Sequence, residues 1–448
     1  MSRSRAHASV IAARRSLAYD GPGLPCRRRA MKRSLIGTSI GAAFAMAAGS
    51  AYGGAFGIAT QTGPGTGNAN AGGAAGAEDA SVVWTNPAAM SALPQGKHFS
   101  LAGHLLRPSF KFRNEGSTIP AVLGSGNGGD GGDWAVVPNG YFAMSLGNNL
   151  SFGVGVNAPF GLKTEFDSGW IGQRIALSSE IKTVNINPSI AYKVAPNVSI
   201  GAGVSAQYLE AELTNASQLG RSKLEADDIG WGFNVGIAVQ ASPSTRVGLH
   251  YRSSIKYELE GDASFSGVPA ANANVRADLR VPENVSLSIF SAVTPQWELM
   301  ADLTWTRWSR IKSIVPICRN VSFGVCPVAG NALVGATLPT NWKDTWRISV
   351  GANYRHSAAW KFRFGLAYDP TPTNNTDRTA RLPDEDRFWV ALGAQYTVSK
   401  NGKIELGYAH EFVRDSKVNT QVFGTAFRQT GHFEDRADIL TAAYSHSF

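Results

Sequence analysis

Long apolar runs are almost absent from this sequence of 448 residues. A helix that spans a membrane needs about 20 predominantly apolar residues, and the nearest approach, residues 35–48, is shorter. Lys32 and Arg33 precede this run and small residues follow it, which is typical of a secretory signal peptide that is removed. The sequence therefore predicts a signal peptide at residues 31–53 and no membrane-spanning helix after it.

Acidic residues are scarce at the start of the chain, where Asp20 is the only one before residue 31. The arginine-rich residues 1–30 fit either an organelle transit peptide or a start site placed too early, with Met31 as the true initiator. A complete signal peptide directly after Met31 favours the second interpretation. We therefore expect residues 1–30 to be a non-native extension.

This leader holds most of the excess positive charge. Residues 1–53 carry nine Lys and Arg and one acidic residue, a net +8 of the +9 for the whole chain, which leaves about +1 for the rest. The high pI therefore gives no support for a nucleic-acid partner, which would need a basic surface.

Cysteines and catalytic motifs are also scarce. Of the three cysteines, Cys26 lies in the leader, and an exported chain permits a disulfide between Cys318 and Cys326. No further cysteine or histidine stands near these two at the spacing of zinc ligands. The sequence has no G-x-S-x-G motif and its eight histidines are scattered, so we expect neither an enzyme nor a bound metal or cofactor.

The abundant pattern is a two-residue alternation that starts at about residue 99. In VSIGAGVSAQY, residues 198–208, apolar side chains alternate with Ser, Gly and Gln, which is typical of strands with one apolar face. Fourteen such segments occur, near residues 99–113, 135–147, 149–158, 181–195, 197–213, 229–242, 245–259, 275–293, 296–310, 343–356, 359–369, 386–399, 402–414 and 436–448.

The connections between these segments alternate in length. Tight turns such as SKNG alternate with long polar or Gly-rich stretches such as 311–342, aromatic residues gather near strand ends, and the chain closes on Phe448. An even strand number with this loop pattern is typical of outer-membrane barrels, whose closure leaves no strand edge in lipid. A soluble β-sandwich would also alternate but would not require these features. We expect an all-β protein of the bacterial outer membrane, a 14-stranded antiparallel transmembrane β-barrel at residues 99–448.

Residues 54–98 lack strand periodicity and are rich in glycine. They contain one Asn-Pro-Ala, at Asn86 to Ala88, a tripeptide also known from water channels, but those channels need membrane-spanning helices. A compact segment before a barrel is either a periplasmic linker or a plug of the lumen. A barrel of fourteen strands is wide enough to need filling if it is not to leak.

Three stretches carry a resemblance to a known family. They are AEDASVVWTNPAAM, APFGLKTEF at residues 158–166, and GLAYDPTPTNNTDRTARLPDEDRFWVALGAQY at residues 365–396. In these stretches the sequence resembles the FadL-type (OmpP1/FadL/TodX-like) long-chain fatty acid transporters of the bacterial outer membrane. The resemblance covers essentially the whole mature chain.

The resemblance implies a monomeric barrel, surrounded by outer-membrane lipid and lipopolysaccharide, with a hatch at residues 54–98 that plugs the lumen. Asn86, Pro87 and Ala88 would anchor this hatch, because Pro87 fixes a turn and Asn86 can bond backbone groups.

The resemblance also implies that extracellular loops capture a hydrophobic substrate, which leaves sideways through a kink in the third strand. Gly153, Gly155 and Pro159 would supply this kink, although ordinary packing in the lumen would also explain the glycines. The third and fourth long loops, near 214–228 and 260–274, would form a capture groove. Its apolar candidates are Leu219, Leu224, Phe265 and Val268.

A desolvated carboxylate needs a cation or several donors. The alternation places Arg252, Lys256, Arg347, Lys361 and Arg363 towards the lumen. Of these, Arg347 and Arg363 are the candidates for binding a fatty acid carboxylate, and pairing with inward acids such as Glu405 is the competing explanation. The acidic run that ends in Arg387 is expected to form an ion-pair network that steadies the sixth long loop.

Two other functions stay open. Members of the family differ mainly in the lining of the pocket, so the uptake of aromatic hydrocarbons or other hydrophobic compounds is the alternative. A general porin would have an open, charged lumen, and residues 54–98 argue against it.

Overall fold

The structure is a computed structural model that describes residues 54–448. The expectations for residues 1–30 and 31–53 fall outside the described residues. Within residues 54–448, no helix is long and apolar enough to cross a membrane.

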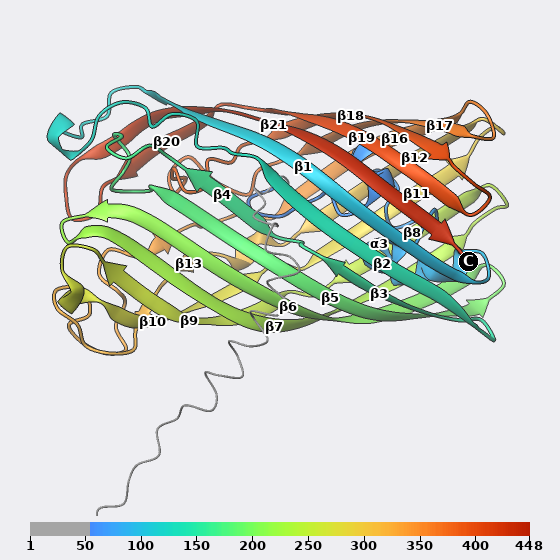
Figure 1. Ribbon diagram of the computed structural model, residues 1–448, viewed down its shortest axis with the longest axis horizontal. Coiled ribbons are helices and arrows are strands. Elements are labelled where there is room, and N and C mark those ends of the chain that lie inside the picture. The colour runs from blue at the N-terminus through green and yellow to red at the C-terminus, as the bar shows by residue number, and fades with distance from the viewer. Residues whose placement is uncertain (1–53) are drawn as a thin grey trace, which may run out of the picture. The chain divides into compact units, whose positions relative to one another are not determined.

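The described chain forms a closed barrel of antiparallel strands (Figure 1). β1 (Lys97–Asn114) pairs with β21 (Arg428–Ser447) from His98 to Asn114, and this ladder closes the sheet. Between them, in chain order, lie β2 (Ala135–Gly147), β3 (Leu150–Asn157), β4 (Gly161–Glu165), β5 (Ser178–Ala195), β6 (Val198–Ser217), β7 (Gly220–Gln240), β8 (Thr245–Arg252), β9 (Ile255–Phe265), β10 (Ala273–Val281), β11 (Asn284–Ala292), β12 (Trp297–Thr306), β16 (Thr345–Arg355), β17 (Trp360–Asp369), β18 (Arg387–Thr397), β19 (Gly402–Val413) and β20 (Ser416–Gln421). Because β3–β4, β8–β9, β10–β11 and β19–β20 each continue one strand, the barrel has fourteen strands, and the predicted fold class is confirmed.

The remaining elements are short. β13 (Ser313–Ile314) pairs with β15 (Leu338–Pro339), and β14 (Ile317–Cys318) adds to the edge of β10. The 3-10 turns η2 (Ala121–Leu123), η3 (Pro269–Ala271) and η4 (Trp308–Arg310) lie in connections between strands.

The face of the wall that carries the apolar side chains differs between the part of the barrel within the membrane and the part above it. In the membrane half of β7, Trp231 is 71% exposed on the outer face, whereas Asn234 is buried in the lumen. In β9 the order is reversed, because Ile255, Tyr257 and Leu259 are buried inside and the charged residues between them are exposed. A strand that leaves the hydrocarbon can face water outside and bury apolar side chains inside. The upper lumen is therefore apolar.

This reversal explains three wrong expectations. Residues 214–228 are a β-hairpin, in which β6 and β7 pair up to Ser217 and Gly220, and no long loop. Most of residues 260–274 likewise belongs to β9 and β10. Lys256, expected in the lumen, lies on the outer face with its side chain 45% exposed and its Nζ 2.7 Å from Glu258. In all three places charged residues point outwards above the membrane, where the sequence pattern alone suggests a polar loop or an inward cation.

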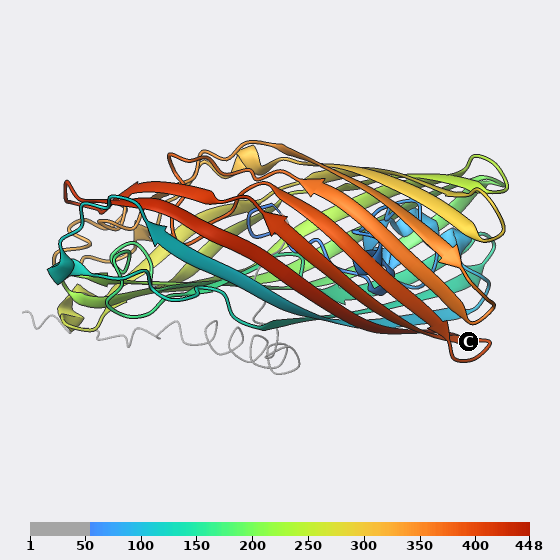
Figure 2. The same cartoon turned by 90° about the horizontal axis from the view of Figure 1, so that it is seen from above.

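Residues 54–96, the N-terminal segment, lie inside the barrel (Figure 2). The segment contains α2 (Gly63–Gly67), α3 (Val82–Thr85) and η1 (Pro87–Ala92). Glycines of the wall make room for it: a Cβ added at Gly236 would overlap the side chain of Asn86, and one added at Gly201 would overlap the backbone at Pro87 and Ala88. The small inward residues of the strands thus let the segment pack directly against the wall.

Candidate functional site

The Asn-Pro-Ala motif joins the N-terminal segment to the wall. Asn86 is fully buried, and its Nδ2 donates to the carbonyl oxygens of Ala74 at 2.8 Å and Ile237, in β7, at 3.0 Å. Its Oδ1 accepts from the amide of Ala88 at 3.1 Å and caps η1, whose first residue is Pro87. Asn86 therefore satisfies three backbone groups that belong to two parts of the segment and to the barrel.

Arg363 is held by acids of the protein itself. Its side chain is 1% exposed, and its Nη2 lies 2.7 Å from Oε2 of Glu78, in the N-terminal segment, and 2.7 Å from Oε1 of Glu405, in β19. Burial raises the pKa of Glu78, but the charges of Arg363 and Lys361 outweigh burial and hold this pKa well below its usual value. The sequence left two roles open for Arg363, binding a fatty acid carboxylate or pairing with inward acids. The contacts of Arg363 are those of the second role.

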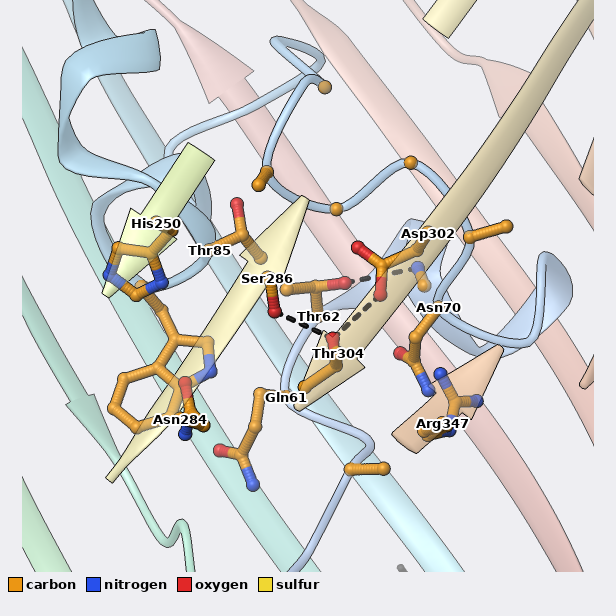
Figure 3. A pocket seen from close by; sticks show the side chains of 18 of the residues that line it. Gln61, Thr62, Asn70, Thr85, His250, Asn284, Ser286, Asp302, Thr304 and Arg347 are labelled. Atoms are coloured by element: carbon orange, nitrogen blue, oxygen red, sulfur yellow. Dashed lines mark hydrogen bonds between the residues drawn. The ribbon is translucent and has the colours of Figure 1, made fainter. Parts of the chain in front are cut away.

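A cavity of about 270 Å³ lies between the N-terminal segment and the inner face of the wall (Figure 3). His250 and Asn284 line one end, and Asp302 and Arg347 line the other. Between them, Thr304 Oγ1 bonds Ser286 Oγ at 2.6 Å and Asp302 Oδ1 at 2.7 Å. The cavity is therefore lined by hydrogen-bonding groups from β8, β11, β12 and β16.

Arg347, in contrast to Arg363, lines this cavity. Its Nη2 donates to the carbonyl oxygen of Ala69 at 2.7 Å, and its Nε lies 3.8 Å from Asp369 Oδ2. Its guanidinium also lies 5.2 Å from the ring centroid of Trp389. The Nε of Arg347 is buried, faces Asp369 and has no hydrogen-bond partner among the described residues, so this arginine is less fully bonded than Arg363.

An aromatic cluster borders the cavity and extends into the apolar upper lumen. The ring centroid of Phe56 lies 5.3 Å from that of Trp308 and 5.7 Å from those of Phe160 and Trp342. Phe160 and Trp308 also line the cavity. Buried apolar residues of β9 and β10 surround this aromatic cluster. The apolar surface of the aromatic cluster is therefore continuous with the polar lining of the cavity, an arrangement suited to an amphipathic molecule.

The third strand is interrupted next to the same cavity. β3 pairs with β2 only as far as Val156 opposite Gly140, and among the described strands β4 pairs with β5 alone. The interruption lies at residues 158–160, which include Pro159. It does not lie at Gly153 and Gly155, which stay in regular pairing.

The two glycines of β3 make room for side chains that pack in the lumen. A Cβ added at Gly153 would collide with Val83 and Met90, and one added at Gly155 would lie within 3.0 Å of the ring of Tyr141. Ordinary packing in the lumen, the competing explanation, accounts for these glycines.

The N-terminal segment supplies partners for the backbone at the interruption. Gln61 Nε2 donates to the carbonyl oxygen of Ala158 at 2.8 Å, and the amide of Ile58 donates to that of Pro159 at 2.8 Å. Backbone that leaves a β-ladder at membrane depth needs such partners inside the protein. The interruption is therefore covered from the inside by residues that belong to the N-terminal segment.

The sixth long loop contains the expected ion-pair network. Asp384 pairs with Arg387, and Arg378 Nη2 lies 2.7 Å from Glu385 Oε2. Asp384 Oδ2 also accepts from the amide of Ala55 at 3.0 Å. The network thus holds both the loop and the start of the N-terminal segment.

The four apolar residues proposed for the capture groove come together in one cluster. Phe265 is buried, and the other three, Leu219, Leu224 and Val268, pack partly buried around it. Cys318 and Cys326 are joined by a disulfide and belong to the same cluster. The loop that carries this disulfide therefore packs against the four residues.

Comparison with known proteins decides the family. The family described as outer membrane protein transport protein (OMPP1/FadL/TodX) matches residues 44–448. The chain belongs to this family. It is 26% identical over 397 residues to the long-chain fatty acid transport protein of Salmonella typhi, which covers 79% of this chain and 86% of that protein. The protein is therefore an outer-membrane β-barrel of the OMPP1/FadL/TodX family, a family of transporters and channels.

Solved structures of the OMPP1/FadL/TodX family share the fold. A FadL homologue of Pseudomonas aeruginosa superposes with a TM-score of 0.79 at 24% identity, covering 88% of this chain and 100% of that one. The Ralstonia pickettii toluene transporter TbuX superposes with a TM-score of 0.61 at 20% identity, covering 87% and 98%.

Sequence reasoning did not single out two residues of the site. The alternation placed Arg252 in the lumen but could not separate it from the other inward cations. Glu78 was not identified at all, because no periodicity orients the N-terminal segment. An acid within a Gly-rich segment that precedes a barrel is the one signal that could have found Glu78.

Proposed function

We propose that this protein takes up long-chain fatty acids across the outer membrane. The observation that carries this proposal is the contact between the aromatic cluster and the polar cavity, which share Phe160 and Trp308. An acyl chain gains about 0.8 kcal/mol per buried CH₂, and a carboxylate needs donors when it leaves water. Adjacent apolar and polar surfaces meet both needs without any chemical step.

The N-terminal segment acts in this proposal as a hatch, anchored at Asn86, Pro87 and Ala88. It fills the lumen so that ions and water do not pass freely, and Asn86 and Glu78 fix it to the wall. The barrel works as a monomer with lipid and lipopolysaccharide around it.

The substrate leaves sideways through the interruption of the third strand at Pro159. Pro159 and Phe160 line the cavity, and within residues 54–448 only the N-terminal segment and β5 bond the backbone there. A small movement of the segment would free this part of the wall without breaking a ladder between β2 and β4.

Capture begins at Leu219, Leu224, Phe265 and Val268. Because the disulfide loop packs on these four residues, the loop has to shift before a substrate can reach them. Arg363, one of the two arginines expected to meet the carboxylate, has its donors engaged by Glu78 and Glu405. Arg347, the other, lines the cavity, but Asp369 and Asp302 lie at its end of the cavity.

Uptake of an aromatic hydrocarbon is the second candidate, and one observation favours it. The cavity of about 270 Å³ is at the small end for ligand pockets. Four aromatic rings line it, those of Trp84, Phe160, Phe290 and Trp308. A compact aromatic molecule would fit such a space without a carboxylate partner.

Uptake by the purified protein in liposomes separates these functions. Saturable entry of radiolabelled oleate supports the fatty acid proposal, and toluene entry without oleate entry moves the protein to the hydrocarbon branch. A steady single-channel conductance in a planar bilayer would contradict both and indicate a general porin.

A further inference from the structure

Arg252 is a buried cation. It ends β8, its side chain lies beneath the N-terminal segment, and only 8% of the residue is exposed. Its guanidinium stacks on Trp84 at 3.5 Å from the ring centroid, and Nη2 donates to the carbonyl oxygen of Trp84 at 3.0 Å. Nη1 donates to Ser205 Oγ at 3.3 Å. Among residues 54–448 no carboxylate forms an ion pair with it, and a charge buried in this way is costly.

The other cavity arginine differs in this respect. Arg347, at the opposite end, has Asp369 at 3.8 Å from its Nε and shares its end of the cavity with Asp302. Acids of the protein therefore offset the charge of Arg347 before any ligand binds. Among the described residues, only neutral groups bond the guanidinium of Arg252.

The end of the cavity at Arg252 is rich in unused donors. Arginine has five N–H donors, of which the two named bonds engage two. Asn284 is its cross-strand neighbour in β11 and also lines the cavity. The side-chain amide of Asn284 has no hydrogen-bond partner among the described residues. His250, two positions before Arg252, lines the same end (Figure 3).

We infer that Arg252, with Asn284 beside it, binds the carboxylate of the transported fatty acid at this end of the cavity. The inference rests on the proposed function and names the residue pair that selects an anionic head group. A guanidinium binds a carboxylate through two parallel N–H···O bonds, and the stacking on Trp84 occupies a face of the guanidinium and leaves its edge for those bonds. The head group would thus meet the N-terminal segment at Trp84, and the acyl chain would extend towards the aromatic cluster.

The test compares an acid with its neutral ester on protein purified from the outer membrane. Dissociation constants for oleate and methyl oleate are measured for the unchanged chain, for Arg252→Met and for Arg246→Met. Arg246 is the matched control, since it faces the lumen from the same strand, contacts the ring of Phe290 and does not line the cavity. We expect Arg252→Met to weaken oleate binding roughly ten- to a hundredfold, as loss of hydrogen bonds to a charged group does. Methyl oleate binding should stay within about twofold, and Arg246→Met should change neither.

Each other outcome overturns the inference in a different way. Equal weakening of both ligands in Arg252→Met would make Arg252 a support for Trp84 only, and no weakening would place the carboxylate elsewhere. If the unchanged protein binds methyl oleate as tightly as oleate, no anion site exists, while uptake of acyl chains still stands. If it binds neither, the proposed function itself fails.

Discussion

Arg363 and Glu78 form an ion pair, 2.7 Å between Nη2 and Oε2, that joins the barrel wall to the segment inside it. The residues are 285 positions apart in the chain, so the pair exists only when the segment has docked in the finished barrel. Glu405, in β19, binds the same guanidinium. The charges of Glu78, Arg363 and Glu405 therefore form one group.

Removing the cation of this group should destabilise the protein strongly. Arg363→Met leaves Glu405 buried without its counter-charge and leaves Glu78 with Lys361 alone, and breaking a buried pair costs about 3–5 kcal/mol. The midpoint of urea unfolding in detergent micelles measures this loss. Arg113→Met is the control, because the side chains of Arg113 and Glu434 are 51% and 47% exposed in their pair, and an exposed pair contributes less than about 1 kcal/mol. Equal effects of the two substitutions would contradict the account.

Adding one methyl group at Gly236 should loosen the N-terminal segment. The new Cβ would overlap Asn86, so the two backbone bonds from Asn86 Nδ2 would be lost or strained. We expect Gly236→Ala to produce frequent opening events in single-channel recordings. Gly103→Ala is the control, since no atom lies within 4 Å of a Cβ added there. A closed channel in both variants would show that the Asn86 anchor does not hold the segment.

The backbone at the interruption of the third strand should depend on Gln61. Gln61 is buried and bonds Ala158 through Nε2 at 2.8 Å, so Gln61→Ala should speed amide hydrogen exchange at residues 157–161 roughly tenfold, as loss of one buried hydrogen bond predicts. Gln95→Ala, in an exposed part of the same segment, should leave exchange there unchanged. Faster exchange spread over the whole barrel would contradict a local role.

The disulfide should matter for its loop and not for the barrel. Closing a loop as short as residues 318–326 stabilises it by about 2–3 kcal/mol. Cys326→Ser should therefore make residues 311–342 sensitive to protease while the urea midpoint of the barrel stays the same. A large fall in that midpoint would show that the loop supports the wall. Oleate uptake in this variant would also report whether a freer loop exposes Leu219 and Phe265.

The barrel could be predicted from the sequence because, in a strand within the membrane, alternating apolar and polar residues face the lipid and the lumen in turn. Trp231 and Asn234 take opposite faces as the pattern requires. Above the membrane the rule reverses, and the hairpin at 214–228 was mistaken for a loop because its outward residues, such as Lys223 and Glu225, are charged.

The site could be predicted only in part. Alternation placed Arg252, Arg347 and Arg363 in the lumen, but their roles depend on what each one contacts. Glu78 neutralises Arg363, Asp369 lies near Arg347, and in the described part of the chain only Trp84 and Ser205 bond Arg252. Three of these partners, Glu78, Trp84 and Asp369, come from positions whose direction no local pattern sets, since they lie in the N-terminal segment or at a strand end.

The most direct test of fatty acid uptake is the dependence of affinity on chain length. Dissociation constants are measured on the purified protein for a series from octanoate to oleate. If the aromatic cluster and the upper lumen bury the chain, each added CH₂ should tighten binding about fourfold, the equivalent of about 0.8 kcal/mol. An affinity that stays flat along the series, with toluene binding intact, would contradict the account and assign the barrel to aromatic compounds.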